Sequence, residues 1–133
     1  MQADEEHRVG SVVKRMLHAI DHAETNVLDE VWADDSSMFF PFLNTPQLAV
    51  GKPAVIARLS ALFEKLRKNG LQPPFVGFRM DDIRIDIVGD AALCTFTYCV
   101  GAQIARRTMF LVRRNGDWRI KHVHGSNAKA PGN

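Results

Sequence analysis

The stretch Asn115-Gly116-Asp117-Trp118-Arg119-Ile120-Lys121-His122-Val123-His124 carries the clearest structural signal in this sequence. Its first two residues form the dipeptide that most strongly favours a tight hairpin turn, and apolar residues recur through the rest as they do in a strand. Gly89-Asp90 and Gly101-Ala102 mark two further turns upstream. The second half of the chain therefore predicts an antiparallel meander of four strands, at 75–88, 91–101, 103–114 and 117–126.

The first half of the chain is dominated by helical spacing of apolar residues. Such spacing predicts a helix over 4–23 and a shorter one over 25–33. Pro53 suits the first turn of a third helix, and Gly70 suits its end. A short apolar strand is expected at 38–42, followed by a loop over 43–51. Together, the two halves predict an α+β domain.

The bulk composition narrows the class of protein. The chain has 133 residues, is 46% hydrophobic and carries a formal net charge of +2, which suits a single soluble domain spanning 1–133. No basic stripe with interleaved aromatic residues occurs, so nucleic acid is not expected as a partner. No apolar run approaches the ~20 residues of a membrane span, and no membrane partner is expected.

The cysteines and the first residues of the chain indicate the cellular compartment in which we expect the protein. Cys94 and Cys99 lie five apart in one expected strand, so they face opposite ways and cannot pair with each other. The acidic first residues have no apolar run behind them, which argues against a signal peptide. We expect a cytoplasmic protein without a cofactor or bound metal.

Both faces of the predicted strands are apolar. In 103–114, Met109 and Leu111 point one way while Phe110 and Val112 point the other. Three helices can cover one face of a single sheet, so the other face needs a different cover. A second copy of the chain is the simplest one, and we therefore expect a homodimer through the outer sheet face.

Four short motifs occur in order along the chain: Val31-Trp32-Ala33-Asp34-Asp35-Ser36, Gly51-Lys52-Pro53-Ala54-Val55, Val88-Gly89-Asp90-Ala91-Ala92 and the quoted stretch continued to Ser126. In order and spacing the chain is similar to the nuclear transport factor 2-like superfamily, and in particular to its SnoaL-like domains, over about residues 8–127. The resemblance implies a cystatin-like cone, in which three N-terminal helices pack on a strongly curved antiparallel sheet around a pocket.

Two relatives in that superfamily suggest chemistries that this chain lacks the residues for. Aligned on ketosteroid isomerase, the catalytic base falls on Phe40, the oxyanion-binding tyrosine on Met16 and the second aspartate near Thr108 or Met109. None of these side chains can take the isomerase roles, because the isomerase mechanism uses an aspartate base and an oxyanion hole formed by a tyrosine and a protonated aspartate.

The other relative is the association domain of calcium/calmodulin-dependent kinases, which binds carboxylates through arginines. Its arginine positions fall on about Tyr98, Met109 and Gly125 in this sequence. The arginines are therefore absent, although Arg107 can reach into the pocket from a neighbouring position.

The remaining polar residues are the candidates for a site. His122 and His124 lie two apart, which predicts one shared face with Trp118 and Ile120. Two such imidazoles can bind a metal, serve as acid and base, or simply hydrogen-bond within the core or a dimer interface. A β-bulge near Trp118 would instead turn them to the opposite face.

Tyr98, the only tyrosine, is expected on the pocket face, where it is either a ligand donor or a core phenol. The candidate catalytic residues are thus Tyr98, His122 and His124. The candidate ligand-binding residues are Met16, Trp32, Phe40, Phe42, Tyr98, Arg107 and Met109.

Two functions fit these residues. The first is binding of a small, largely apolar molecule in the pocket, extended to isomerase-, cyclase- or lyase-type proton transfer if the protein is an enzyme. The alternative is a non-enzymatic dimerisation or association domain whose pocket is vestigial.

Overall fold

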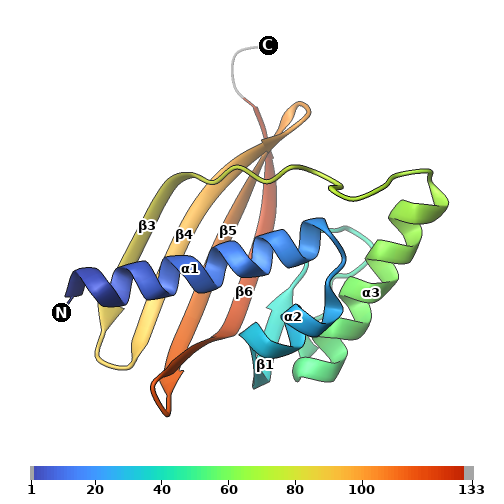
Figure 1. The fold of residues 1–133 in the computed structure, drawn as a ribbon. Helices are drawn as coiled ribbons and strands as arrows, with labels where there is room; N and C mark the ends of the chain where they lie inside the picture. The colour runs from blue at the N-terminus through green and yellow to red at the C-terminus, as the bar shows by residue number, and fades with distance from the viewer. Residues whose placement is uncertain (1, 131–133) are drawn as a thin grey trace.

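Three helices lie on one side of a six-stranded sheet in the computed structural model, which describes residues 2–130 (Figure 1). The ends of the predicted domain, Met1 and 131–133, lie outside the described residues. The expected α+β class is confirmed. In chain order the elements are α1 (Gln2–Asp21), α2 (Thr25–Val31), β1 (Trp32–Phe39), β2 (Ala49–Val50), α3 (Lys52–Lys68), β3 (Asp81–Val88), β4 (Ala91–Val100), β5 (Gln103–Arg114) and β6 (Asp117–Lys129).

The sheet is mixed, and this corrects the expectation of a wholly antiparallel one. Its strand order is β2-β1-β6-β5-β4-β3, and the four long strands form the predicted meander. Strand β1 joins the open edge of that meander parallel to β6. Because β1 follows helix α2 and is not joined to β6 by a hairpin, the short turn that enforces antiparallel pairing is missing.

Two strand boundaries differ from the sequence prediction. Strand β1 begins at Trp32 and ends at Phe39, so it includes residues 34–37, which lie between the predicted helix 25–33 and the predicted strand 38–42. Strand β3 begins at Asp81, and residues 75–80 form an irregular segment before it. The two-residue strand β2 lies within the expected loop 43–51 and pairs with Ser37 and Met38 of β1.

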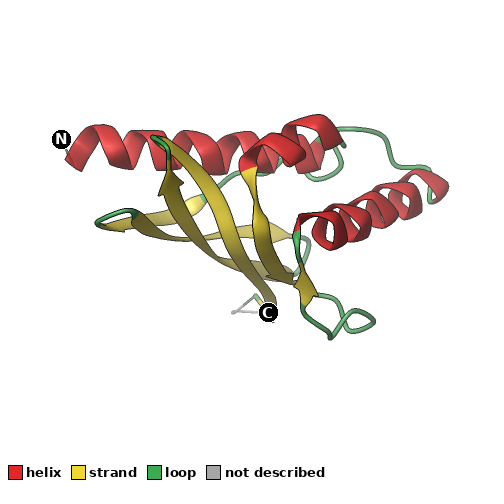
Figure 2. Ribbon diagram, turned by 90° about the horizontal axis from the view of Figure 1, so that it is seen from below, coloured by secondary structure: helices red, strands yellow, loops and turns green. Residues whose placement is uncertain are grey.

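The inner and outer faces of β4 and β5 alternate as predicted. Met109 and Leu111 of β5 are buried beneath the helices, whereas Phe110 is 39% exposed on the other face. In β4, Cys94 is buried and Cys99 is exposed. Burial raises the pKa of the Cys94 thiol to about 11. Figure 2 shows the helices gathered on one side of the strands, so the inner face is the one that they cover.

Strand β6 contains a one-residue bulge that reverses the expected side-chain directions. Leu111 of β5 lies opposite Ile120, but the preceding residue, Phe110, lies opposite His122, so Lys121 has no partner across the ladder. Trp118 and Ile120 are buried before the bulge, and Val123 is buried after it. The prediction that His122 and His124 share the face of Trp118 and Ile120 is therefore wrong, because the extra residue turns both histidines outward.

No helix within residues 2–130 has the length and apolar character needed to cross a membrane.

Candidate functional site

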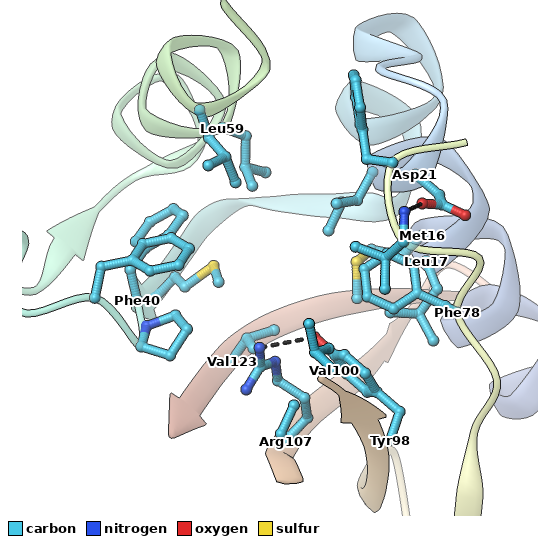
Figure 3. A pocket seen from close by; sticks show the side chains of 18 of the residues that line it. Met16, Leu17, Asp21, Phe40, Leu59, Phe78, Tyr98, Val100, Arg107 and Val123 are labelled. Carbon is cyan, nitrogen blue, oxygen red and sulfur yellow. Dashed lines mark hydrogen bonds between the residues drawn. The ribbon is translucent and has the colours of Figure 1, made fainter. Parts of the chain in front are cut away.

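A cavity of about 300 Å³ lies between the helices and the inner face of the sheet (Figure 3). All seven residues predicted to line a pocket do line this cavity: Met16, Trp32, Phe40, Phe42, Tyr98, Arg107 and Met109. They come from helix α1, strands β1, β4 and β5 and the segment after β1. The structure thus brings them together around one space, and their role in binding stays a prediction.

The apolar walls of the cavity come mainly from helices α1 and α3. Met16, Leu17 and Ile20 recur at helical spacing in α1, so they lie on one side of it. Helix α3 contributes a second set from its own buried side. That set consists of Leu59, Leu62, Phe63 and Leu66.

The polar part of the cavity is a tyrosine–arginine pair on two adjacent strands. Arg107 of β5 donates a hydrogen bond from Nη2 to the hydroxyl of Tyr98 in β4, at 2.8 Å. Its guanidinium carbon lies 5.2 Å from the centre of the Tyr98 ring, within the range of a cation–π contact. Nη1 donates to the backbone carbonyls of Arg106 and Ser126. The pair therefore stands on the inner face in a fixed arrangement.

The two members of this pair keep their ordinary neutral-pH protonation states. Burial raises the pKa of the Tyr98 hydroxyl, and Arg107 only partly opposes this. Burial also lowers the pKa of the Arg107 guanidinium, but arginine stays cationic in proteins. At neutral pH the cavity therefore presents a protonated phenol and a positive charge.

Gly125 of β6 makes room for the Arg107 guanidinium. A Cβ atom at this glycine would lie 3.2 Å from Nη1 of Arg107 and 3.2 Å from Cδ of Pro41. Such separations are tighter than ordinary van der Waals contact, so a larger side chain would displace the arginine, the proline or both.

Asp21, near the end of helix α1, is the acidic residue among those described as lining the cavity, and it was not among the site residues predicted from the sequence. It is only 5% exposed, because its carboxylate faces the segment between α3 and β3. Its oxygens accept hydrogen bonds from the backbone N–H groups of Val76, at 2.6 Å, and Gly77, at 2.9 Å. Its spacing of four from Leu17 was the signal for a buried position, but the residues that receive it lie 55 positions away in the chain.

The segment anchored by Asp21 closes one side of the cavity. Phe75 stacks on Phe63 of α3, with ring centres 6.1 Å apart. Phe78 meets Tyr98 edge to face, with ring centres 4.9 Å apart. This segment was expected to be the start of a strand, and it serves instead as a wall over the tyrosine.

The structure separates the three candidate catalytic residues. Tyr98 lines the cavity, but His122 and His124 lie on the outer face of the sheet and do not line it. Nδ1 of His122 and Oγ of Ser37 share a hydrogen bond of 2.7 Å. The ring of Phe39 contacts that of His124, with centres 5.3 Å apart. Burial and the nearby His124 lower the pKa of His122.

Solved structures share this fold at low sequence identity. A candidate dehydratase of the nuclear transport factor 2-like family from Streptomyces avermitilis is 19% identical with a TM-score of 0.80, over 98% of this chain and all of that one (100%). A protein with a cystatin-like fold from Caulobacter vibrioides is 15% identical with a TM-score of 0.75, over 93% and 89% of the two chains. A candidate ketosteroid isomerase from Shewanella frigidimarina is 20% identical with a TM-score of 0.69, over 88% and 93%.

These likenesses establish the nuclear transport factor 2-like fold. The SnoaL-like domain family matches residues 9–130, and the chain therefore belongs to the SnoaL-like family. The resemblance seen in the sequence motifs is confirmed. Among curated proteins, none matches the chain.

Proposed function

We propose that this protein binds a small, largely apolar molecule in the cavity between its helices and the inner face of its sheet. The observation that carries the proposal is the make-up of that cavity. Its walls are mostly aliphatic and aromatic, and its polar side chains are few: Tyr98 and Arg107, which are hydrogen-bonded to each other, together with Asp21, Gln103 and Asn127. An apolar enclosure with a few fixed polar groups is typical of small-molecule sites.

The size of the cavity suits a small ligand. At about 300 Å³ it lies at the lower end of the range for such sites. A well-packed protein interior leaves few voids larger than a water molecule, so a space of this size is not explained by ordinary core packing. Residues at its margin are exposed, with Val100 43% and Val76 45% accessible, which leaves a route from solvent.

The same residues favour binding over isomerase-type catalysis. Proton transfer of that type needs a base in the cavity, and Tyr98 and Arg107 are both donors at neutral pH. The carboxylate of Asp21 already accepts backbone hydrogen bonds from Val76 and Gly77. Proton-transfer chemistry in this cavity would therefore rest on Tyr98 as an acid.

A thermal-shift screen tests the proposal directly. The compounds are hydrophobic carboxylic acids, steroids and aromatic polyketides, and a ligand that binds the folded state should raise Tm by several degrees at saturation. Val100→Trp places a bulky ring at the cavity margin and should abolish the shift. Val88→Trp, at a strand end that is 77% exposed and outside the cavity, is the matched control. The absence of any shift in the wild-type protein would refute the proposal, as would an equal shift in Val100→Trp.

A further inference from the structure

The two charged side chains in the cavity wall are not paired with each other, and this points to the ligand. Among the described residues that line it, Arg107 is the one cationic side chain and Asp21 the one acidic side chain. The carboxylate of Asp21 accepts hydrogen bonds from the backbone N–H groups of Val76 and Gly77, in the segment over the cavity. Within residues 2–130, Arg107 forms no ion pair with any acidic group. A positive charge therefore lies in a largely apolar enclosure without an ion-pair partner among the described residues.

This arrangement differs from that of two other arginines of β5. Arg113 and Arg114, farther along the same strand, are both paired with carboxylates, at 2.7 Å and 2.8 Å. The side chain of Arg113 is 31% exposed and that of Arg114 is 50% exposed, so water also reaches both of them. Arg113 and Arg114 thus have acidic partners in addition to water, whereas Arg107 faces the cavity without an ion pair, and burial makes an unpaired charge costly.

The hydrogen-bonding capacity left at the pair is entirely of the donor kind. A guanidinium has five N–H donors, and three of those on Arg107 are used, two by backbone carbonyls and one by Tyr98. The Tyr98 oxygen accepts from Arg107, so its own hydrogen is free to donate, and no acceptor for it is found among the described residues. Two N–H groups and one O–H group are therefore left for a molecule in the cavity.

We infer that the ligand carries an anionic head group, of the carboxylate kind, which Arg107 and Tyr98 bind while its apolar body lies against helices α1 and α3. The inference rests on the proposed function and narrows it to amphipathic organic anions. A planar anion with two acceptor oxygens matches the fork of a guanidinium, and the phenol supplies a further donor. The apolar walls contribute affinity by burying the apolar body of the ligand, and this contribution does not depend on the charge of the head group.

Three compounds with one alkyl chain and different head groups test the inference. Octanoate is anionic, octanamide neutral and octylamine cationic, and calorimetry measures the binding of each. Octanoate should bind the wild-type protein roughly ten- to a hundredfold more tightly than octanamide, the range for hydrogen bonds to charged groups. Octylamine should bind more weakly than octanamide, because Arg107 repels it.

Substitutions then locate the preference. Arg107→Met should bring the affinity for octanoate down to that for octanamide and leave octanamide binding unchanged, which also shows that the variant is folded. Arg107→Lys should keep part of the preference, and Tyr98→Phe should lower octanoate affinity by a smaller factor. Arg106→Met removes the same charge from the neighbouring outer-face position and is the matched control, with the preference unchanged.

The outcomes separate this inference from the proposed function. Equal binding of octanoate and octanamide, or tighter binding of octylamine, would overturn the anionic head group and leave an apolar binding site standing. An undiminished octanoate preference in Arg107→Met would overturn the role of this arginine. Binding of none of the three compounds to the wild-type protein would overturn both proposals.

Discussion

The inner and outer faces of β4, β5 and β6 are built from the same three strands but hold different kinds of side chain. The inner face is largely apolar, with Tyr98 and Arg107 as a hydrogen-bonded polar pair and Gln103 and Asn127 as further polar residues, and it borders the cavity. The outer face mixes half-exposed apolar residues, such as Leu93 and Phe110, with histidines at 122 and 124. Strand alternation alone accounts for the division in β4 and β5, but in β6 it depends on the bulge at Lys121. The side chains that each face of β6 carries can therefore be assigned only when the register of its pairing with β5 is known.

Deletion of Lys121 should have the largest effect on this division. Without the extra residue, either Trp118 and Ile120 or Val123 must exchange faces with polar neighbours. We expect a loss of more than about 5 kcal/mol in the free energy of unfolding, comparable with the whole stability of a marginal domain. Urea denaturation followed by near-ultraviolet circular dichroism measures it. Lys121→Ala keeps the register and is the control, and a deletion variant as stable as this control would show that the bulge does not define the faces.

A pair of leucine truncations compares the packing of the two faces. Leu111→Ala, at a fully buried inner position, should cost about 2–5 kcal/mol. Leu93→Ala, which is 42% exposed on the outer face of the neighbouring strand, should cost about 1 kcal/mol or less. Chemical denaturation of both variants gives the difference directly. Similar losses would mean that the outer leucine is also covered in solution, as it would be in a dimer.

The homodimer stays a prediction, and Phe110 offers a test of it. Phe110→Glu places a charge at the centre of the outer face and should convert the dimer to a monomer. Sedimentation should give about twice the 14.9 kDa chain mass for the wild-type protein and the single chain mass for the variant. Leu43→Glu, in a fully exposed loop away from the sheet, is the control and should leave the mass unchanged. A wild-type protein that sediments as a monomer would remove the dimer.

The outer-face histidines should give the smallest effect, visible as a pH dependence of stability. The pKa of His122 is lowered from 6.5 by burial, with His124 as a second cause. As the pH falls below 6.5 the unfolded chain takes up the proton first, so the folded state loses stability until the pH passes the lower folded-state pKa. His122→Gln should flatten the slope of unfolding free energy in this window. Urea midpoints across the pH series measure it, with His7→Gln as the control, and an unchanged slope in His122→Gln would contradict the assignment.

Much of this architecture could be predicted from the sequence because its causes are local. The alternation of β4 and β5 follows from a two-residue period, and it placed Tyr98 and Met109 on the inner face correctly. The cavity residues of α1 follow in the same way from helical spacing. The family motifs set the order of the elements, and the comparisons bear that out.

The features that the sequence did not predict depend on distant parts of the chain. The bulge at Lys121 exists only relative to its partner strand β5, so nothing within β6 marks it. Asp21 is buried because of a segment more than fifty residues away that donates to it. The parallel pairing of β1 with β6 joins the two halves of the chain, and no turn motif in the sequence predicts it. Each of these contacts is a tertiary effect that overrides a local pattern.

The close approach of Gly125 to Arg107 has a consequence for how related sequences vary. An arginine in this pose needs the space that a side chain at 125 would occupy, so the two positions are not free to change independently. Among SnoaL-like chains we expect an arginine at the position of Arg107 to occur together with glycine at the position of Gly125. Chains that have lost the arginine should accept larger residues there. The pair would then serve as a two-letter signature, readable without a structure, for members of the family that share this charged cavity.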